Sequence, residues 1–584
     1  MAVKRVLIKF GLLLSKHQKL RIIELSVLMI IGGLLETFSV SMMIPFVDAV
    51  MDPEAAMEKW YAKIVCDLFK IDDGKNFLIV LSIVLAIFYI AKNVYLSLEY
   101  NLQYKFVYGN MLDLQERLLD SFIHRPYEFF LNVKSGDVIR VIGSDVRDAF
   151  DLLVVMLVMF TEIVVALMLM VAVFVISPSM TLCIAIVLLL LLGIIYFILR
   201  PVMRRMGLSR QSSASEMNKW ILQSIQGIKE LKVTQKETFF KDNYIRSGRV
   251  YVNSIRWQQT LDIMPRFVIE SICMGGIFIT VAILIGNNAG LESVVPSLSA
   301  VAMAGIRLLP SINRISGALN KVSYNEPMLD RVIENVQEMN RIDVLGEDDA
   351  REKPLQGKEK NNHKKIEIKK VTYHYPQSKE NVLIDASMTV NKGEFIGIVG
   401  SSGAGKTTVV DLVLGLLQPN KGEILFDGID VNDDVSAWLA KIGYIPQTIF
   451  MLDDTIRANV AFGVKERDIN DERVWDAIKG AALDEFILSL PEGLDTQIGE
   501  RGVRMSGGQR QRVGIARALY QNPEIMIFDE ATSALDNDTE KEIMKSIHDL
   551  RGNKTIIIIA HRLTTIEDCD HIFRVENGKI IQER

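Results

Sequence analysis

The sequence predicts a multi-pass α-helical membrane domain joined to an α/β domain of the P-loop type. Three observations support this fold class: six long apolar runs lie before residue 320, a hydrophilic stretch covers residues 341–370, and a glycine-rich loop pattern occupies residues 400–407. We expect six transmembrane helices within residues 1–330, a linker at 331–364 and the α/β domain at 365–584.

The composition agrees with this segregation of apolar and polar segments. Hydrophobic residues make up 49% of the chain and charged residues 23%, which excludes a disordered, collagen-like or uniformly soluble protein. The formal net charge is −5, so no basic excess points to a nucleic-acid partner. The four cysteines (Cys66, Cys183, Cys273 and Cys569) are too far apart to indicate a disulfide framework or a zinc site.

The apolar runs have the length that membrane-spanning helices need. Residues 181–199 contain no charge and match the ~20 residues that cross a bilayer. Similar runs, some interrupted by a single ionisable residue, occur at 22–47, 77–98, 152–177, 262–286 and 291–318. A buried core helix would explain any one run, but the succession of runs favours a membrane domain.

Basic residues predict the orientation of the spans. Residues 4–21 contain lysines and arginines but no acid, and residues 200–249, between the fourth and fifth runs, are also rich in them. We expect the spans to lie in the inner membrane of the cell. By the positive-inside rule we expect the N-terminus and the α/β domain to lie in the cytoplasm. No small-residue cleavage site follows the first run, which argues against a signal peptide.

The loop after the first span has an amphipathic pattern. Apolar residues recur at helical spacing at Met57, Trp60, Tyr61, Ile64 and Leu68, with charged residues between them. The segment would be either a helix packed over a neighbouring span or an interfacial helix that contacts lipid.

The α/β domain contains a predicted phosphate-binding loop. Residues 394–400 predict a buried strand that leads directly into G-x-x-x-x-G-K-T and an apolar helix. Such glycines let backbone N–H groups surround phosphate oxygens, Lys406 would reach the β- and γ-phosphates of ATP, and the Thr407 hydroxyl would bind Mg²⁺. The predicted ATP contacts of the loop are Gly400, Ser401, Ser402, Gly403, Ala404, Gly405, Lys406, Thr407 and Thr408.

Two further predicted strands end in side chains suited to ATP hydrolysis. Residues 525–529 lead into Asp529 and Glu530, of which the first would hold Mg²⁺ and the second would polarise the attacking water as a general base. The alternative is an acidic surface pair at a strand end. Residues 555–560 lead into His561, whose imidazole would lie near the γ-phosphate.

The order of these motifs resembles ATP-binding cassette (ABC) proteins. Ser506 lies 100 residues after Lys406 in a sequence similar to the ABC signature, with Met505 where leucine is usual. Gln447 resembles the Q-loop residue, residues 533–536 the D-loop, and Tyr375 the aromatic residue that stacks on adenine. With six spans ahead of one cassette, the chain resembles ABC exporters of the half-transporter kind (type IV).

This resemblance implies functional roles for residues beyond the phosphate loop. The implied catalytic residues are Glu530, His561 and Gln447. The implied Mg²⁺ ligands are Thr407, Gln447 and Asp529. The implied ATP contacts outside the phosphate loop are Tyr375, Ser506, Gly507, Gly508 and Gln509. Because the family's signature acts on the partner's phosphate loop, the resemblance also implies a homodimer, with coupling through cytoplasmic loops at 126–136 and 227–240.

Ionisable residues within the spans are candidates for contact with cargo, because each is costly in lipid unless it faces water, a partner or cargo. They are Glu36, Lys92, Glu162, Arg266, Glu270 and Arg307. The cations Lys92, Arg266 and Arg307 would suit a phosphate or diphosphate headgroup. Internal pairing, for example of Arg266 with Glu270 one helical turn later, is the alternative.

Local similarity suggests a substrate class. Residues 36–46 and 307–314, with the amphipathic outer segment, resemble the lipid-linked oligosaccharide flippases of bacterial N-glycosylation (the PglK type). This resemblance implies transport of a polyprenyl-diphosphate oligosaccharide from the inner to the outer leaflet. Export of another lipid, a drug or a peptide, or a non-transporting ATP-gated regulator, are the alternatives.

Overall fold

The structure is a computed structural model of the chain. It describes residues 2–584 except 60–61, 64–65, 68–70, 72, 134, 177, 287–290, 353–364, 379, 500–501, 531–539, 542–543, 546, 549–550 and 561–565. Most side chains of residues 172–184, 273–307 and 342–352 also lie outside the description. The contacts divide the chain into a helical unit, residues 1–125 and 133–351, and a second unit, residues 126–132 and 352–584.

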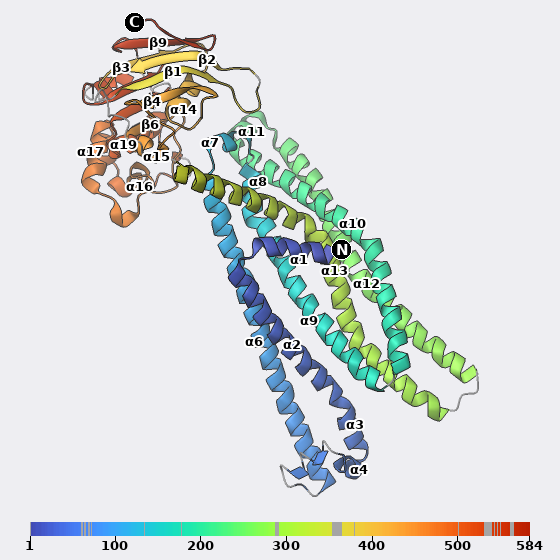
Figure 1. The fold of residues 1–584 in the computed structure, drawn as a ribbon. Helices are drawn as coiled ribbons and strands as arrows, with labels where there is room; N and C mark the ends of the chain where they lie inside the picture. The colour runs from blue at the N-terminus through green and yellow to red at the C-terminus, as the bar shows by residue number, and fades with distance from the viewer. Residues whose placement is uncertain are drawn as a thin grey trace. The chain divides into compact units, whose positions relative to one another are not determined.

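The helical unit consists of long helices and short connecting ones (Figure 1). Its helices are α1 (Ala2–Leu13), α2 (Lys16–Ser41), α3 (Met43–Met51), α4 (Pro53–Met57), α6 (Gly74–Ile123), α8 (Ser135–Arg140), the π-helix η1 (Val141–Asp145), α9 (Val146–Ile176), α10 (Pro178–Gln226), α11 (Ile228–Thr234), α12 (Glu237–Gly286) and α13 (Leu291–Glu352).

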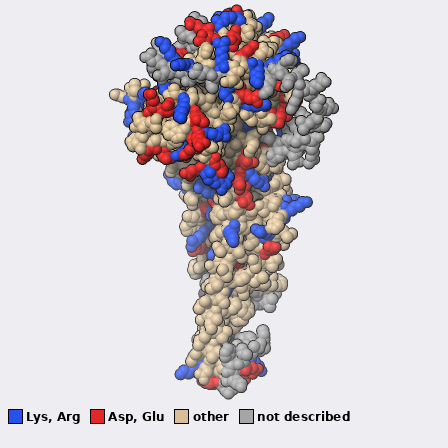
Figure 2. Space-filling view, turned by 90° about the vertical axis from the view of Figure 1, so that its left-hand side faces the viewer, with Lys and Arg blue, Asp and Glu red and all other residues tan. Residues whose placement is uncertain are grey.

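Four helices of the described residues are long and apolar enough to cross a membrane: 16–39, 74–123, 136–171 and 185–226. They overlap the first four predicted spans, and only 77–98 lies entirely within its helix range. The remaining predicted spans, 262–286 and 291–318, fall within α12 and α13. Charged side chains are sparse over much of the visible surface of the helical unit and more frequent towards its ends, as expected for helices in lipid (Figure 2).

The first part of the predicted linker, 331–364, is helical in the structure. Helix α13 continues to Glu352, and Val332, Val336 and Met339 on it are buried in a cluster that includes Phe10 of α1. These residues recur at i, i+4 and i+7, so they form an apolar stripe that stabilises the helix by packing. The charged composition of the segment concealed this stripe.

The predicted outer segment is only partly described. Met57 ends α4 and packs against a small core that contains Ala56 and Phe77. The other apolar residues of the pattern, Trp60, Tyr61, Ile64 and Leu68, lie outside the described residues.

The second unit contains two sheets among its described residues. The antiparallel sheet has the order β2-β1-β4-β5, and the larger sheet, parallel except for β10, has the order β10-β9-β3-β8-β7-β6. The strands are β1 (Ile366–Tyr373), β2 (Leu383–Val390), β3 (Phe395–Val399), β4 (Lys421–Phe426), β5 (Ile429–Asp430), β6 (Ile442–Ile445), β7 (Ile525–Asp529), β8 (Thr555–Ile559), β9 (His571–Glu576) and β10 (Lys579–Gln582).

Helices of this unit belong to two cores separated by the larger sheet. They are α7 (Tyr127–Asn132), α14 (Lys406–Val413), α15 (Val435–Leu439), α16 (Ile456–Val460), α17 (Asp471–Gly480), α18 (Asp484–Leu488) and α19 (Gly507–Tyr520), with 3₁₀ turns η2 (Glu466–Asp468) and η3 (Gly493–Asp495). In β8, Ile556 and Ile558 pack with α16, α17 and α19, whereas Ile557 and Ile559 pack with α14 and the antiparallel sheet. This alternation explains why the strand is apolar at every position.

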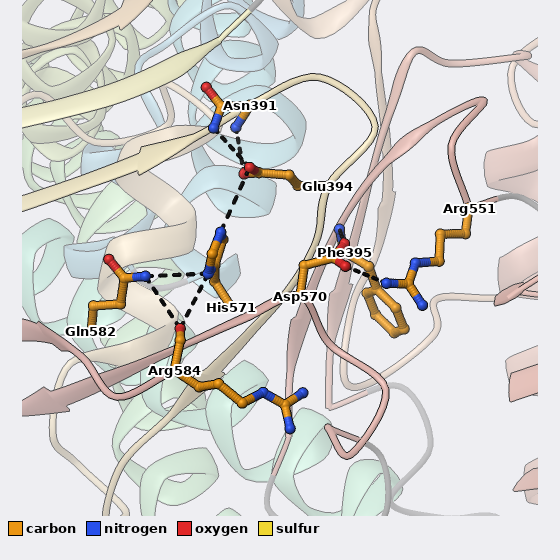
Figure 3. Close-up of polar contacts among 8 residues, drawn as sticks. All are labelled: Asn391, Glu394, Phe395, Arg551, Asp570, His571, Gln582 and Arg584. Carbon is orange, nitrogen blue, oxygen red and sulfur yellow. Dashed lines mark hydrogen bonds and ion pairs between the residues drawn. The ribbon is translucent and has the colours of Figure 1, made fainter.

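A polar network fixes β9 and β10 beside β3 (Figure 3). The Glu394 carboxylate accepts hydrogen bonds from the backbone and side-chain N–H groups of Asn391, both at 2.7 Å, and lies 3.7 Å from His571 Nε2. The Asp570 carboxylate accepts the Phe395 N–H at 2.9 Å and pairs with Arg551. These contacts hold the start of β3, which carries the phosphate loop at its other end.

Candidate functional site

The phosphate loop has a backbone that only glycine can adopt at two positions. Gly400 has φ +155°, and a Cβ atom there would lie 2.5 Å from the Val575 carbonyl oxygen. Gly405, which caps α14, has φ +103° and a Cβ there would lie 3.0 Å from Val382. The loop is therefore a bare backbone cradle at the N-terminus of α14, a site suited to phosphate.

The Lys406 ammonium lies inside the phosphate loop. It donates hydrogen bonds to the carbonyl oxygens of Gly400 at 3.0 Å and Ser401 at 3.1 Å, and the side chain is buried. Thr407 is exposed, whereas Thr408 is buried and its hydroxyl lies 3.0 Å from the Tyr375 hydroxyl. Of the two threonines, Thr407 is thus the one whose hydroxyl is accessible to an entering ligand.

Asp529 and Glu530 reach the same edge of the sheet. Strand β7 neighbours β8, which neighbours β3, and all three are parallel, so their carboxyl ends lie together. Burial, and then the adjacent Glu530 carboxylate, raises the pKa of Asp529, and Lys406 lies within electrostatic range of it. The Tyr444 hydroxyl donates to Asp529 Oδ2 at 3.3 Å. A buried carboxylate and an accessible hydroxyl at the same edge of the sheet provide the oxygen ligands that Mg²⁺ prefers.

Gln447 and Glu530 are brought together by the tertiary structure. The Gln447 side-chain N–H donates to Glu530 Oε2 at 2.7 Å. Glu530 itself has φ 51°, a left-handed conformation unusual for a residue with a side chain. Strain of this kind persists where the surrounding structure imposes it, which is frequent at active sites.

The signature segment begins a well-capped helix. Ser506 caps α19 through a capping box, in which its hydroxyl accepts the Gln509 N–H at 3.2 Å and its own N–H donates to Gln509 Oε1 at 2.8 Å. Met505 is buried in the core, so the departure from leucine affects packing only. Among the described residues, no hydrogen bond or ion pair joins this segment to the phosphate loop.

Some predicted residues lie outside the description. His561 and the D-loop residues 533–536 are among them, and so is the side chain of Arg307. Lys92 is half-buried with its ammonium 5.0 Å from the centre of the Tyr89 ring. The Arg266 side chain is exposed, and in the described part of the chain it forms no ion pair with Glu270.

The structure adds Arg314 and Glu99 to the charged residues of the spans. Arg314 pairs with Glu162, and its side chain is 58% exposed while that of Glu162 is 6% exposed. Arg314 lies within the predicted span 291–318, seven residues after Arg307, so it could have been identified from the sequence. Glu99 is buried, and the predicted span ended one residue before it.

Asp411 is a further missed residue beside the phosphate loop. It lies on α14, where burial and then the Asp529 carboxylate raise its pKa from 3.8 to about 6. Nothing in its local sequence signals this, because the neighbouring carboxylate comes from β7.

Asp411 predicts a pH dependence of stability. Because the pKa of Asp411 is raised in the folded state, its protonated form contributes to the stability of the fold. This contribution is fully present below about pH 4 and is lost as the pH rises through about 6. We expect Asp411→Asn in the full chain to be more stable than wild type at neutral pH, on the order of 1 kcal/mol after allowance for solvent screening. Thermal unfolding of wild type and variant at several pH values measures this. If stability depended on pH between 4 and 6 in the same way in both proteins, the prediction would be contradicted.

A short helix from the first half of the chain packs with this unit. Helix α7 belongs to the second unit, although the residues on both sides of it, Arg125 and Val133, belong to the helical unit. The Tyr373 hydroxyl donates to Glu128 Oε1 at 3.4 Å. The rings of Tyr373 and Tyr375 pack edge to face at 5.3 Å, which links α7 to the residue expected at the adenine.

Comparison with known proteins places these features in a family. The chain matches the model of the ABC transporter transmembrane region over residues 26–302 and the ABC transporter model over residues 383–533. It is 29% identical to a putative multidrug export ATP-binding/permease protein YgaD of Bacillus subtilis, over 81% of this chain and 80% of that protein. It is also 29% identical to an ATP-dependent lipid A-core flippase of Burkholderia orbicola, over 81% of this chain and 78% of that protein.

A solved structure shows the same fold. A bacterial Atm1-family ABC exporter with ATP bound superimposes with a TM-score of 0.72 at 23% identity, covering 97% of this chain and 95% of that one. The predicted fold class, a helical membrane domain fused to a P-loop ABC domain, is confirmed. The chain therefore belongs to the ABC transporters, as an exporter half-transporter in which one transmembrane region is joined to one domain that hydrolyses ATP to drive transport.

Proposed function

We propose that this exporter moves a lipid with a phosphorylated glycan headgroup from the inner to the outer leaflet of the cell's inner membrane, with its N-terminus and ATP-binding domain in the cytoplasm. Polyprenyl-diphosphate oligosaccharide is the member of this class that we favour. The lipid A-core flippases among its relatives, at 29% identity, support the lipid class. The multidrug exporter YgaD, equally similar, makes drug export the second candidate.

The observation that supports ATP turnover is the meeting of Lys406, Asp529, Glu530 and Gln447 at one sheet edge. Lys406 would exchange the loop carbonyls for β- and γ-phosphate oxygens. Thr407, Asp529 and Gln447 would hold Mg²⁺, which offsets phosphate charge when bound. Glu530 would accept a proton from the attacking water, Gln447 would orient Glu530, and His561 would contact the γ-phosphate.

A second copy of the chain would complete each ATP site. Ser506 at the start of α19 is exposed, and Gly507 and Gly508 after it are half-buried. A helix start of this kind can bind phosphate, and in this chain no described contact joins it to the phosphate loop. In a two-fold homodimer the signature of one chain faces the phosphate loop of the other, which yields two equivalent sites. Tyr375 would stack on the adenine of the ATP held by its own chain.

Arg314 supports an anionic headgroup. Its guanidinium is exposed while the Glu162 carboxylate behind it is buried, so the pair holds a cation at the surface of the span bundle. A guanidinium can bind phosphate through two parallel hydrogen bonds. Lys92, Arg266 and Arg307 remain candidates for further contacts with the headgroup.

Transport in vesicles tests the proposal. The full chain would be reconstituted with labelled polyprenyl-diphosphate oligosaccharide, a phosphorylated glycolipid of the lipid A type, or a cationic drug, and leaflet accessibility followed with and without ATP. We expect movement of one or both phosphorylated lipids. Movement of the drug alone would favour the second candidate, and hydrolysis without movement of any cargo would favour an ATP-gated regulator.

A double variant tests the role of Arg314. Changing Arg314→Gln together with Glu162→Gln removes both charges, keeps the size of the buried side chain at position 162 and leaves no buried carboxylate unpaired. We expect lipid transport to fall several-fold while hydrolysis without cargo is retained. Equal loss of both activities would show that the pair serves folding.

Helix α7 predicts a coupling contact. Glu128→Ala removes the acceptor of the Tyr373 hydroxyl, whereas Glu128→Gln keeps a carbonyl oxygen there. Because a single hydrogen bond contributes ~1 kcal/mol, we expect Glu128→Ala to reduce cargo-stimulated hydrolysis a few-fold and Glu128→Gln to reduce it less. Hydrolysis with and without cargo measures this, and equal behaviour of the two variants would contradict it.

A further inference from the structure

Glu99 of α6 is a buried carboxyl group that neither ATP hydrolysis nor the proposed headgroup contact uses. Its side chain is 3% exposed and lies where α6 packs against α2. A Cβ atom on Gly32 of α2 would lie 2.3 Å from Glu99 Oε2 and 3.1 Å from Leu96. The carboxyl oxygen therefore fills the space that the missing glycine side chain leaves, and no volume remains there for cargo.

The carboxyl group has few partners. Oε1 accepts the Gln103 side-chain N–H at 3.0 Å, and Oε2 is buried without a hydrogen-bond partner among the described residues. Gln103 is itself 1% exposed and its own oxygen is also without a partner there. An ionised carboxylate is only an acceptor and offers about four lone-pair positions, so a single donor leaves most of its charge uncompensated in an apolar bundle.

The charged side chains around Glu99 include other carboxyl groups. Glu36 faces it from α2, and Glu162 of α9 and Arg314 of α13 share the Tyr100 neighbourhood with it. Arg314 is paired with Glu162 and also interacts electrostatically with Glu36, whereas the charged neighbour that acts on Glu99 is the Glu36 carboxylate. Two tyrosines of α6 interact electrostatically with Glu99 but do not compensate it: Tyr95 donates to the Leu28 carbonyl oxygen at 2.8 Å, and Tyr100 lies among the three carboxyl groups.

We propose that Glu99 is a proton-binding site of the transmembrane unit, occupied while its carboxyl group is enclosed at Gly32 and emptied when water reaches it. In the enclosed state Oε2 carries the proton as a neutral carboxylic acid. When water reaches Oε2, the proton passes to the water and leaves a solvated carboxylate. Each exposure of the carboxyl group to water would then exchange one proton with the aqueous phase, whatever the exporter's cargo.

A proton fits this place better than a larger cation. The described residues contain no group of three or more acidic, histidine or cysteine side chains suited to a metal ion, and a sodium ion or a cargo ammonium group requires several oxygen ligands. At Glu99 the Gly32 contact occupies the space that such a cation would need. A proton adds no volume.

Infrared spectroscopy of the reconstituted full chain tests the proposal. A protonated carboxylic acid has a carbonyl band above the amide bands, and glutamine lacks it. At neutral pH we expect this band in the wild type, its loss in Glu99→Gln, and its retention in Glu24→Gln, which removes an exposed carboxyl group from α2. A band of equal intensity in wild type and Glu99→Gln would overturn the proposal, as would a band that disappears when sodium replaces potassium.

Gly32→Ala provides a second variant that changes no titratable group. Its methyl group would displace Oε2 from the packed position, so we expect the band to weaken or shift. This variant keeps the test decisive if Glu99→Gln does not fold, because an unaltered band in Gly32→Ala would contradict the assignment. The chain can be trapped with ATP and vanadate while a pH dye follows the protons that it exchanges with the solution. We expect the number of protons exchanged to differ by about one per chain between wild type and Glu99→Gln.

Discussion

Glu530→Gln is expected to lower ATP hydrolysis by at least about 100-fold while the protein still binds ATP. Glutamine keeps the size of the side chain but cannot accept a proton from water. Gln447 Nε2, which donates to Glu530 Oε2 at 2.7 Å, can donate to the amide oxygen instead, so the local structure should persist. Turnover and nucleotide binding of the reconstituted protein measure the two effects separately.

The control for this substitution removes the same charge from the same strand region. Glu524, just before β7, pairs with Lys441 at 3.2 Å on the surface, and Glu524→Gln should leave hydrolysis near the wild-type rate. Substantial residual turnover in Glu530→Gln would show that another group accepts the proton. Loss of ATP binding in the same variant would instead indicate that the strained backbone at position 530 depends on the carboxylate.

Dimers that mix two inactive chains are expected to regain activity, up to about half that of the wild type. One chain carries Lys406→Ala, which removes the phosphate-loop ammonium, and the other carries Gly508→Asp, which places a negative charge where the γ-phosphate would bind. Aspartate in the first turn of α19 is compatible with the helix dipole and leaves the Ser506–Gln509 capping box intact. If each signature acts on its partner's loop, such a mixed dimer contains one unaltered site.

The reciprocal mixture distinguishes this arrangement from sites contained within single chains. A wild-type chain paired with a chain that carries both substitutions has no unaltered site in the shared arrangement, but keeps one if each chain is self-sufficient. We expect this dimer to be inactive. Differently tagged chains, purified by both tags in sequence, allow ATP hydrolysis of each mixture to be measured. Activity in the reciprocal mixture alone would reject the composite site.

Several site residues could be predicted because their signals are local. The phosphate loop, the strand that precedes it and the signature each occupy a few consecutive residues, and the required glycine conformations at Gly400 and Gly405 follow from that short stretch. The first four spans were recognised from composition alone. Arg314 could also have been found, since it lies within the predicted span 291–318.

Other features could not be predicted because they join residues far apart. The strand order of the larger sheet decides that Gln447 meets Glu530, 83 residues away, and that Asp411 lies near Asp529. The extension of α13 beyond the predicted boundary at residue 330 depended on packing against α1, which the charged composition concealed.

The sequence by itself therefore determined the fold class, the order of the domains and the phosphate-binding chemistry, since these depend on contiguous residues and on hydrophobic runs. Only the tertiary structure decided that α7 packs with the ATP-binding unit, that Arg314 is held by a glutamate 152 residues away, and that Glu99 is enclosed against Gly32. The physical reason is that burial and charge compensation depend on which helices and strands come into contact, and local sequence does not specify those partners.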